Sequence, residues 1–347
     1  MMKAARLHSI GDLRCDTIER PEPHGKELLI RVAACGICGS DFPRVFAHGT
    51  SNGKYPLTIG HEFAWEVVAV GEEADPKLIG KGGAIFPLIP CGQCPACKTA
   101  HYAMCEHYDY LGSRRDGGFA EYCLIPSDWH FIPSGSADWE TLAMTEPACV
   151  AQHAVRKSGV QAGQFLVIYG AGSIGIMAAR WARIFGVRPL LTDIVQEKVD
   201  FAVSHGMDAV NLQTEDILTA IRNRNGRQLA DAAIEGTGAS SAFAGCISAV
   251  RPLGSIALMG NPMGDTVLPM KIHSMALRKE VSIHGIWNSS RAPYPVDEWA
   301  YTIQMMDAGK LIVSDLITTR LTLEELPLAM EQIKSGERKI VKAMVLP

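Results

Sequence analysis

The sequence predicts an α/β protein in which a doubly wound parallel sheet is joined to a second, β-rich domain. Three features of the 347 residues support this fold class. Residues 1–152 hold short apolar segments separated by Gly- and Pro-rich turns, which is typical of antiparallel strands. Residues 153–287 alternate strand-like and helix-like segments, which favours a parallel sheet with right-handed crossovers. Residues 288–347 return to mixed signals, and we expect this tail to pack back onto the first domain.

Strands are expected where short apolar runs lie between turn signals, and helices where apolar residues recur at helical spacing. In the first domain the expected strands are Leu28–Ala33 and Ala64–Val70. In the second domain they are Phe165–Tyr169, Pro189–Asp193, Asp208–Asn211, Asp231–Glu235, Ser255–Met259 and Val281–His284. The expected helices are Ser173–Phe185, Glu197–His205, Glu298–Ala308 and Leu323–Ser335, and a last strand is expected at Ile340–Leu346.

Composition and charge exclude several classes of protein. Apolar residues make up 47% of the chain and charged residues 20%, which is an ordinary balance for a globular protein. The net charge of −4 provides no bulk attraction for nucleic acid or an anionic membrane. No apolar run has the length of a membrane span, and the N-terminus lacks the apolar stretch of a secretory signal. We therefore expect a cytoplasmic protein with neither nucleic-acid nor membrane partners.

A glycine-rich turn follows the expected strand Phe165–Tyr169 and opens the next helix. Its sequence is Gly170-Ala-Gly172-Ser173-Ile174-Gly175. Such glycines permit a tight turn and let backbone N–H groups approach a pyrophosphate at the helix N-terminus, as in Rossmann-type dinucleotide sites. The alternative is a structural turn in which Ser173 caps the helix. The combination of strand, glycines and helix favours the dinucleotide.

The carboxylate of Asp193 ends the next expected strand, 18 residues after Gly175. An acid at this point accepts hydrogen bonds from the adenosine ribose and repels a 2′-phosphate, which favours NAD over NADP. Ile194 follows, where a protein that binds NADP often carries a basic residue. The alternative is a solvated carboxylate at a strand end.

Four of the ten cysteines, Cys91, Cys94, Cys97 and Cys105, lie close together in the sequence. Four thiolates at this spacing give a closed tetrahedral zinc site, which stabilises a loop and leaves no position for a substrate. Disulfides and an iron–sulfur cluster are the alternatives. A cytosolic chain favours metal over disulfides, and nothing else in the sequence indicates electron transfer.

Three further residues could form a metal site with an open position. Cys38 lies 23 residues before His61, and Glu146 lies near the expected domain junction. Thiolate, imidazole and carboxylate all suit zinc, and three protein ligands leave a fourth position for water or an alcohol oxygen. Taken singly, however, a lone Cys is more often a small core residue. Spacing alone would not bring these three residues together.

The order of these motifs resembles that of the zinc-containing medium-chain dehydrogenases over essentially the whole chain. Glu146-Pro147, where many alcohol dehydrogenases carry a second cysteine, is similar to the branch that includes sorbitol, xylitol and threonine dehydrogenases. Within this branch the closest resemblance is to polyol-phosphate dehydrogenases. The segments that carry it are Cys38–Phe46, Pro87–Cys91, Tyr108–Tyr122 and Gly285–Trp299.

The resemblance implies a GroES-like catalytic domain, NAD and two zinc ions per chain. It assigns Cys38, His61 and Glu146 to the catalytic zinc, with Glu62 nearby as an outer or exchanging ligand, and the four clustered cysteines to a structural zinc. The implied reaction is oxidation of a secondary alcohol of a polyol or polyol phosphate to a ketone, with hydride transfer to NAD and Ser40 taking the substrate proton. The sequence does not exclude another divalent ion in place of the catalytic zinc.

One departure from the family pattern concerns the proton relay. Many relatives carry a histidine two residues after Asp41, where this sequence has Pro43. The route of the proton from Ser40 to solvent therefore stays open. His48 is a conceivable substitute, although a surface position is the simpler expectation.

Arg44, Arg114 and Arg115 are candidate ligands for a substrate phosphate, because guanidinium groups bind phosphates with paired hydrogen bonds. The alternative is that they are solvated or paired with acids. The resemblance also implies a homodimer or homotetramer, with Val281–Gly285 as an edge for pairing between subunits. The remaining alternatives are a free-polyol or threonine dehydrogenase, and a non-catalytic NAD-binding module stabilised by one zinc.

Overall fold

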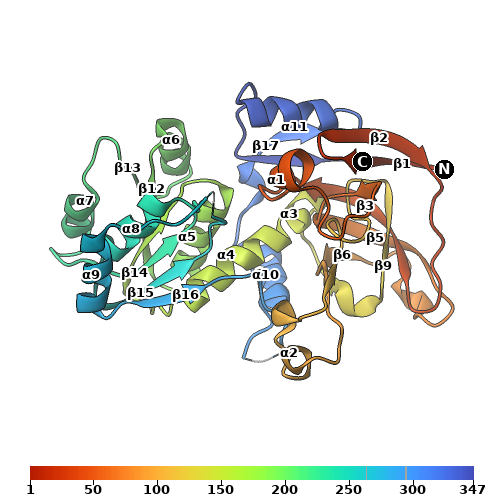
Figure 1. Ribbon diagram of the computed structural model, residues 1–347. Helices are drawn as coiled ribbons and strands as arrows, with labels where there is room; N and C mark the ends of the chain where they lie inside the picture. Colours follow the sequence, from red (N-terminus) through yellow and green to blue (C-terminus); the bar gives the residue numbers. More distant parts are fainter. Residues whose placement is uncertain (263, 294) are drawn as a thin grey trace. The chain divides into compact units, whose positions relative to one another are not determined.

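The computed structural model describes residues 1–262, 264–293 and 295–347. The chain divides into two compact units, one formed by Met1–Pro147 with Ser290–Pro347 and the other by Ala148–Ser289. The first unit is rich in β-strands and the second is a parallel sheet with helices, so the predicted α/β fold class is confirmed. Both ends of the chain belong to the first unit (Figure 1).

The first unit is built mainly from strands. They are β1 (Met2–Ser9), β2 (Asp12–Ile18), β3 (Leu28–Gly36), β4 (Leu57–Thr58), β5 (Glu62–Val70), β6 (Gly82–Ile85), β7 (Leu88–Ile89), β8 (Asp109–Tyr110), β9 (Tyr122–Ile125), β10 (Phe131–Pro133), β17 (Ile317–Leu321) and β18 (Lys342–Val345). Its helical segments are α1 (Asp41–Pro43), η1 (Arg44–His48), η2 (Pro76–Leu78), α2 (Pro95–Lys98), η3 (Tyr102–Met104), η4 (Asp128–His130), α3 (Trp139–Ala143), α10 (Glu298–Asp307), η5 (Ser314–Leu316) and α11 (Leu326–Ser335). The boundary between the units falls within α4 (Thr145–Lys157).

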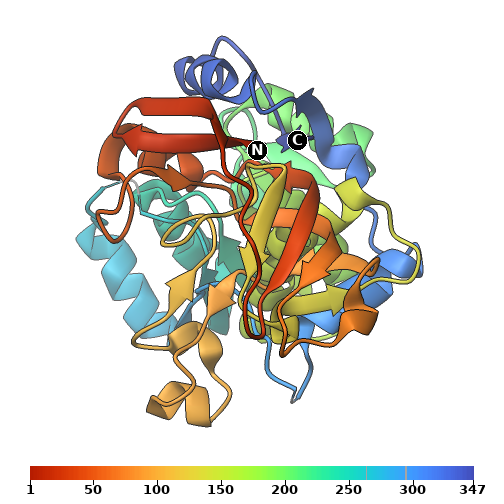
Figure 2. The same ribbon diagram turned by 90° about the vertical axis from the view of Figure 1, so that its right-hand side faces the viewer.

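The largest sheet of this unit has the order β10-β6-β5-β3-β18-β17, and β9 also pairs with β3. A smaller sheet, β2-β1-β4, includes the β1–β2 hairpin, whose two dark red strands run side by side in Figure 2. Strand β18 comes from the end of the chain and pairs antiparallel with β3, with Met344 opposite Gly36. Strand β5 pairs with the other side of β3, with Glu62 opposite Gly36. The C-terminal end of β3 therefore brings together segments almost 300 residues apart in the sequence, and the candidate site lies there.

The second unit alternates strands and helices. Its elements are β11 (Phe165–Tyr169), α5 (Ser173–Ile184), β12 (Arg188–Asp193), α6 (Gln196–Ser204), β13 (Ala209–Asn211), α7 (Ile217–Arg224), β14 (Ala230–Glu235), α8 (Ser240–Ala249), β15 (Val250–Leu258), α9 (Met270–Lys279) and β16 (Ser282–Gly285). The sheet order is β13-β12-β11-β14-β15-β16, with every neighbouring pair parallel; Figure 1 shows β14, β15 and β16 running side by side. The strand order reverses between β11 and β14, which is where doubly wound sheets bind ligands.

Burial explains why the central strand β11 of the second unit is apolar throughout. All five residues of β11 are buried, as expected for a central parallel strand covered on both faces. At the sheet edge, all four residues of β16 are exposed. Among the residues described, no helix combines the length and the apolar character needed to cross a membrane.

Candidate active site and metal centres

Cys38 lies in the turn that joins β3 to α1. Its backbone N–H donates to Asp41 Oδ2 at 2.9 Å, and the Asp41 N–H donates to the Cys38 carbonyl at 3.0 Å. These two hydrogen bonds close the turn around a carboxylate that is completely buried. Ser40, inside the same turn, donates from Oγ to Cys38 Sγ at 3.2 Å. The turn therefore presents a thiol and a hydroxyl together.

His61 and Glu62, at the start of β5, approach this turn. Cys38, His61 and Glu62 each offer one ligand atom, and these three atoms lie within 4.8 Å of one another. Both His61 and Glu62 are buried. His61 Nδ1 lies 3.6 Å from Asp41 Oδ1, which also accepts a hydrogen bond from Arg44 Nη1 at 2.7 Å. The structure thus brings together Cys38, His61 and Glu62, which lie on two neighbouring segments of one sheet.

Glu146 lies in the first turn of α4 and is also buried. It stands outside the group of three ligand atoms, and its Oε1 accepts a hydrogen bond from the Tyr110 hydroxyl at 3.4 Å. Burial raises the pKa of Glu146 to about 7; His61 opposes this rise and Glu62 adds to it. The Glu146 carboxylate is therefore close enough to both residues to sense their charge. Sequence reasoning missed Tyr110, whose ring centroid lies 5.9 Å from that of His61.

This donor set fits a divalent metal ion. Burial, together with the nearby Glu62 and Asp41 carboxylates, raises the pKa of the Cys38 thiol. Without a further positive charge, thiolate and carboxylates would therefore oppose one another in a poorly solvated site. A dication removes that conflict, and a thiolate, an imidazole and a carboxylate are ligands that zinc accepts.

The four clustered cysteines form a second group that could hold a metal ion. The sulfur atoms of Cys91, Cys94, Cys97 and Cys105 all lie within 4.8 Å of one another, and all four cysteines are free of disulfides. The separations are 3.5 Å for Cys94–Cys97 and 4.0 Å for Cys91–Cys97. Zinc–sulfur bonds of about 2.3 Å in a tetrahedron give sulfur atoms about 3.8 Å apart. Backbone N–H groups of Cys97 and Glu106 also lower the pKa of Cys94 to about 6, which favours the thiolate that zinc requires.

The glycine-rich turn lies at the C-terminal end of β11, with α5 beginning at Ser173. Gly175 packs against the turn itself, because a Cβ there would lie 1.9 Å from the Gly170 carbonyl oxygen. Asp193 ends β12, and its Oδ2 accepts a hydrogen bond from the Ala171 N–H at 2.9 Å. The predicted acid and the predicted turn are therefore in direct contact.

A cavity of about 430 Å³ lies at the C-terminal ends of β14, β15 and β16 in the same unit. Buried Glu235, in its lining, accepts hydrogen bonds from the N–H groups of Thr237 and Gly238 at 2.7 and 2.9 Å. These bonds fix the turn that follows β14. Sequence reasoning missed this part of the sheet edge, although the Glu235-Gly-Thr-Gly segment directly after a strand was a signal for it.

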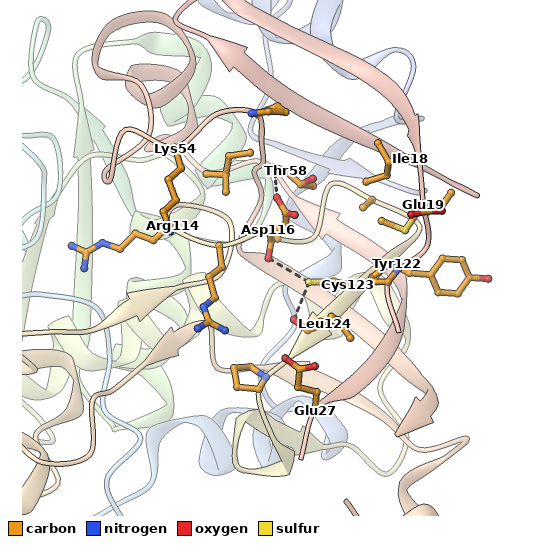
Figure 3. Close-up of a pocket in the computed structure, with 18 residues that line it drawn as sticks. Ile18, Glu19, Glu27, Lys54, Thr58, Arg114, Asp116, Tyr122, Cys123 and Leu124 are labelled. Carbon is orange, nitrogen blue, oxygen red and sulfur yellow. Dashed lines mark hydrogen bonds between the residues drawn. The ribbon is translucent and has the colours of Figure 1, made fainter. Parts of the chain in front are cut away.

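The three candidate phosphate-binding arginines do not lie together. Arg44 is largely buried and paired with Asp41 beside His61. Arg114 donates to the Tyr108 carbonyl and lies over the Tyr108 ring, while the half-exposed Arg115 pairs with Asp109. Arg114 and Arg115 line a separate cavity of about 430 Å³, together with Thr58, Asp116 and Cys123 among others (Figure 3). None of the proposed zinc ligands lines that cavity.

Pro43, which replaces the relay histidine of many relatives, and His48, its conceivable substitute, lie in the adjoining helical turns. Pro43 ends α1, and His48 is exposed at the end of η1.

Lys342 on β18, which the sequence did not single out, is buried and pairs with Glu62.

Comparison with known proteins places this geometry in a family. Residues 24–134 match the alcohol dehydrogenase GroES-like domain, and residues 173–308 match the zinc-binding dehydrogenase domain. Sorbitol dehydrogenase of Bacillus subtilis (strain 168) is 30% identical over 100% of this chain and 97% of its own length. The chain belongs to the zinc-binding dehydrogenase family. Galactitol 1-phosphate 5-dehydrogenase of Escherichia coli (strain K12) is 32% identical over 89% of this chain and 90% of its own length.

A solved structure leads to the same family. The crystal structure of galactitol-1-phosphate dehydrogenase from Escherichia coli matches with a TM-score of 0.91 and 31% identity, covering 100% of both chains. This zinc-binding dehydrogenase is therefore an NAD(P)-dependent oxidoreductase that acts on CH–OH groups, in the polyol branch of the family, and the predictions of the family, of zinc and of a nicotinamide dinucleotide cofactor are confirmed. A non-catalytic module is excluded.

Proposed function

We propose that the enzyme oxidises a secondary hydroxyl of galactitol 1-phosphate to give tagatose 6-phosphate. The proposed oxidation is supported by the close approach of Cys38, His61 and Glu62, with the Ser40 hydroxyl beside the thiol. The substrate is suggested by the name of the Escherichia coli relative, with which the chain shares 32% identity. Oxidation of free sorbitol is the second candidate, because the Bacillus subtilis sorbitol dehydrogenase is 30% identical over 100% of this chain.

The side chains at the end of β3 would divide the work between metal binding and proton transfer. Cys38 and His61 would hold the catalytic zinc together with a carboxylate, either Glu62 or Glu146. Zinc bound there would supply a Lewis acid that favours the ionised form of the substrate hydroxyl. Ser40 would take the hydroxyl proton, since its Oγ lies 3.2 Å from the Cys38 sulfur. The clustered cysteines would hold the structural zinc.

The glycine-rich turn and Asp193 would hold the dinucleotide. N–H groups at the start of α5 suit a pyrophosphate, and Gly172, Ser173 and Ile174 lie where they could provide them. Asp193 would accept hydrogen bonds from the adenosine ribose, which favours NAD over NADP. NAD would accept the hydride from the carbinol carbon, so that polyol and NAD⁺ give ketone, NADH and a proton.

A phosphate on the substrate would bind to a guanidinium group. Arg44 is the first choice, because its partner Asp41 lies 3.6 Å from His61. Arg114 and Arg115 are the second choice, and a phosphate bound by them would occupy the cavity of Figure 3.

The enzyme would act as a homodimer or homotetramer. Strand β16 is a sheet edge, all four of its residues are exposed, and Ile283 among them is apolar. Exposed apolar strands at an edge invite pairing with another chain.

The first experiment is an absorbance assay of NADH production with galactitol 1-phosphate, galactitol, sorbitol, xylitol and threonine in parallel. A strong preference for galactitol 1-phosphate is the expected result. Turnover of free polyols or of threonine alone would reject the phosphorylated substrate and keep the zinc and NAD chemistry. Size-exclusion chromatography with light scattering tests the oligomer, and a monomer would contradict it.

A further inference from the structure

Lys342, at the start of β18, is buried next to the proposed catalytic metal site. Its side chain is 5% exposed, and its Nζ donates to the Ile37 carbonyl oxygen at 2.9 Å and to Glu62 Oε2. A buried ammonium group is costly unless it is paired and hydrogen-bonded. Here both requirements are met by one metal-site carboxylate and one backbone carbonyl of the neighbouring turn.

The absence of a side chain at Gly36 leaves space in the sheet for this ion pair. Gly36 lies opposite Glu62 on β5 and opposite Met344 on β18. A Cβ on Gly36 would lie 2.3 Å from Glu62 Oε2 and 3.0 Å from Lys342 Cε. Any side chain at this position would push the carboxylate and the ammonium group out of their present places.

The charges around the site show what Lys342 contributes. Besides His61, the charge balance of the site involves Cys38, Asp41, Arg44, Glu62, Glu146 and Lys342. Cys35 and Tyr110 are also buried there, and burial raises the pKa of each well above its ordinary value, which keeps both neutral. With Cys38 as a thiolate, the four acids carry four negative charges and the two bases carry two positive charges. A dication makes the sum zero. Without Lys342, the loaded site would keep one uncompensated negative charge.

The ion pair also makes the two carboxylate oxygens of Glu62 unequal. Lys342 engages Oε2, so that Oε1 is the oxygen without this cationic partner. A carboxylate whose second oxygen is held in this way can offer a metal one free oxygen rather than two. This matters because a second bound oxygen would fill the position that an alcohol needs.

We infer that Lys342 is a positioning residue that holds Glu62 by one oxygen and so keeps the fourth position of the catalytic metal open to substrate. The inference rests on the proposed function and on the choice of Glu62, rather than Glu146, as the carboxylate that binds the metal with Cys38 and His61. A purely structural Lys342 would only join β18 to β5 and to the turn after β3, and its loss would affect stability without affecting the metal.

The test compares K342M and K342R in the full-length enzyme after replacing the catalytic metal with Co²⁺. In K342M, Glu62 is free to bind with both oxygens, and the visible d–d absorption should weaken as the coordination number rises. Turnover should fall on the order of tenfold to a hundredfold, as is typical when an outer partner of a metal ligand is lost. K342R, which keeps a cation at Glu62, should retain most of the wild-type spectrum. Thermal unfolding of each variant controls for folding.

A double variant separates this inference from a general weakening of the site. In an E62Q background, K342M should no longer alter the cobalt spectrum, because the carboxylate it releases is absent. A spectrum unchanged in K342M alone, or changed equally in both backgrounds, would overturn the inference. If K342M does not fold, K342Q replaces it in the same comparison, because it keeps an N–H donor for Ile37 and lacks the charge.

Wild-type metal content tests the underlying site separately. Two metal ions per chain are expected, with the release of each to a chromogenic chelator followed by absorbance. One ion per chain, lost only on substitution of the clustered cysteines, would reject the proposed catalytic site itself and the role of Lys342 with it.

Discussion

The buried carboxylate of Asp41 accepts a hydrogen bond from Arg44 at 2.7 Å. The same Oδ1 lies 3.6 Å from His61 Nδ1, and Asp41 Oδ2 accepts from the Cys38 N–H. Asp41 therefore touches both segments that carry the proposed zinc ligands. Arg44 has two roles to separate, since it balances the charge of Asp41 and is also the first candidate for a substrate phosphate.

Substituting Arg44 by Ala should separate these roles when two substrates are compared. Loss of the partner of Asp41 should lower kcat/KM for sorbitol and for galactitol 1-phosphate alike. Loss of a charge-assisted bond to phosphate should cost about 1.5–3 kcal/mol more, or roughly tenfold to a hundredfold, with galactitol 1-phosphate alone. Steady-state kinetics on both substrates give the ratio of kcat/KM for galactitol 1-phosphate to kcat/KM for sorbitol.

The matched controls are R114A and R115A, which remove guanidinium groups from the cavity of Figure 3. If R114A or R115A changes the substrate ratio while R44A leaves it unchanged, the phosphate binds in that cavity and the assignment to Arg44 is wrong. Unchanged ratios in all three variants would contradict phosphate binding by any of these arginines.

Most elements of the second unit followed from the hydrophobic pattern alone. The strand predicted at Phe165–Tyr169 has those bounds, and the helix predicted at Ser173–Phe185 ends one residue earlier, at Ile184. Buried parallel strands and amphipathic helices carry a strong periodic signal within their own residues. The predicted strand Ser255–Met259 instead begins at Val250 and runs through Pro252 and Gly254, two residues that usually interrupt strands.

The candidate site was predictable only where its residues form local motifs. The clustered cysteines and the glycine-rich turn lie within short segments, so their spacing indicated their chemistry. Lys342 gave a weak signal, a lone lysine in an apolar strand, and its pairing with Glu62 depends on a strand contact across 280 residues. The contact between Lys342 and Glu62 follows from the register of β3, β5 and β18, which one sequence does not reveal. Tyr110, on β8, likewise meets Glu146 of α4 only through tertiary packing.

Replacing Cys94 by Ser should remove the structural metal and leave the other site loaded. The Sγ of Cys94 lies 3.5 Å from that of Cys97, and both residues are buried. The substitution therefore removes one of the four cysteine ligands of the structural site. We expect one zinc per chain instead of two and a Tm lower by about 3 °C, which in a chain of this size corresponds to about 2 kcal/mol. Plasma emission spectrometry and calorimetry measure both. C15S, which removes a cysteine outside the four-cysteine cluster, should keep two zinc ions. Loss of zinc from C15S would contradict the assignment of the structural zinc to the clustered cysteines.

Replacing Asp193 by Asn should weaken the preference for NAD. The Asp193 carboxylate holds the Ala171 N–H at 2.9 Å and also accepts from the N–H groups of Ile194 and Val195. Asparagine keeps one acceptor oxygen and loses the charge that repels a 2′-phosphate. The ratio of kcat/KM for NAD to that for NADP should fall on the order of tenfold, which initial rates with each cofactor would measure. D200N, at an exposed acid of α6, is the control. An unchanged ratio in D193N would remove Asp193 from cofactor selection.

Asp307, at the end of α10, should make stability depend on pH. Burial alone would raise the pKa of this carboxyl, but hydrogen bonds from Gly135, Ser134 and the next residues outweigh that effect and lower it. A pKa below the unfolded value of about 3.9 contributes stability that is present above that pH and is lost as the pH falls through the folded value. D307N should therefore be less stable than the wild type at pH 7, by about 1–3 kcal/mol for hydrogen bonds to a charged acceptor.

The difference between D307N and the wild type should shrink below about pH 4, where the wild-type carboxyl also loses its charge. Urea unfolding at pH 7 and at pH 3.5 gives the two free energies of unfolding. D265N, which changes an exposed acid of the other unit, should match the wild type at both pH values. A D307N deficit that persists unchanged at pH 3.5 would mean that the contact depends on shape rather than charge, because asparagine differs from the protonated acid mainly in its amide group. The charge of Asp307, and with it the acid sensitivity of the loop at residues 134–137, would then have no part in holding that loop to α10.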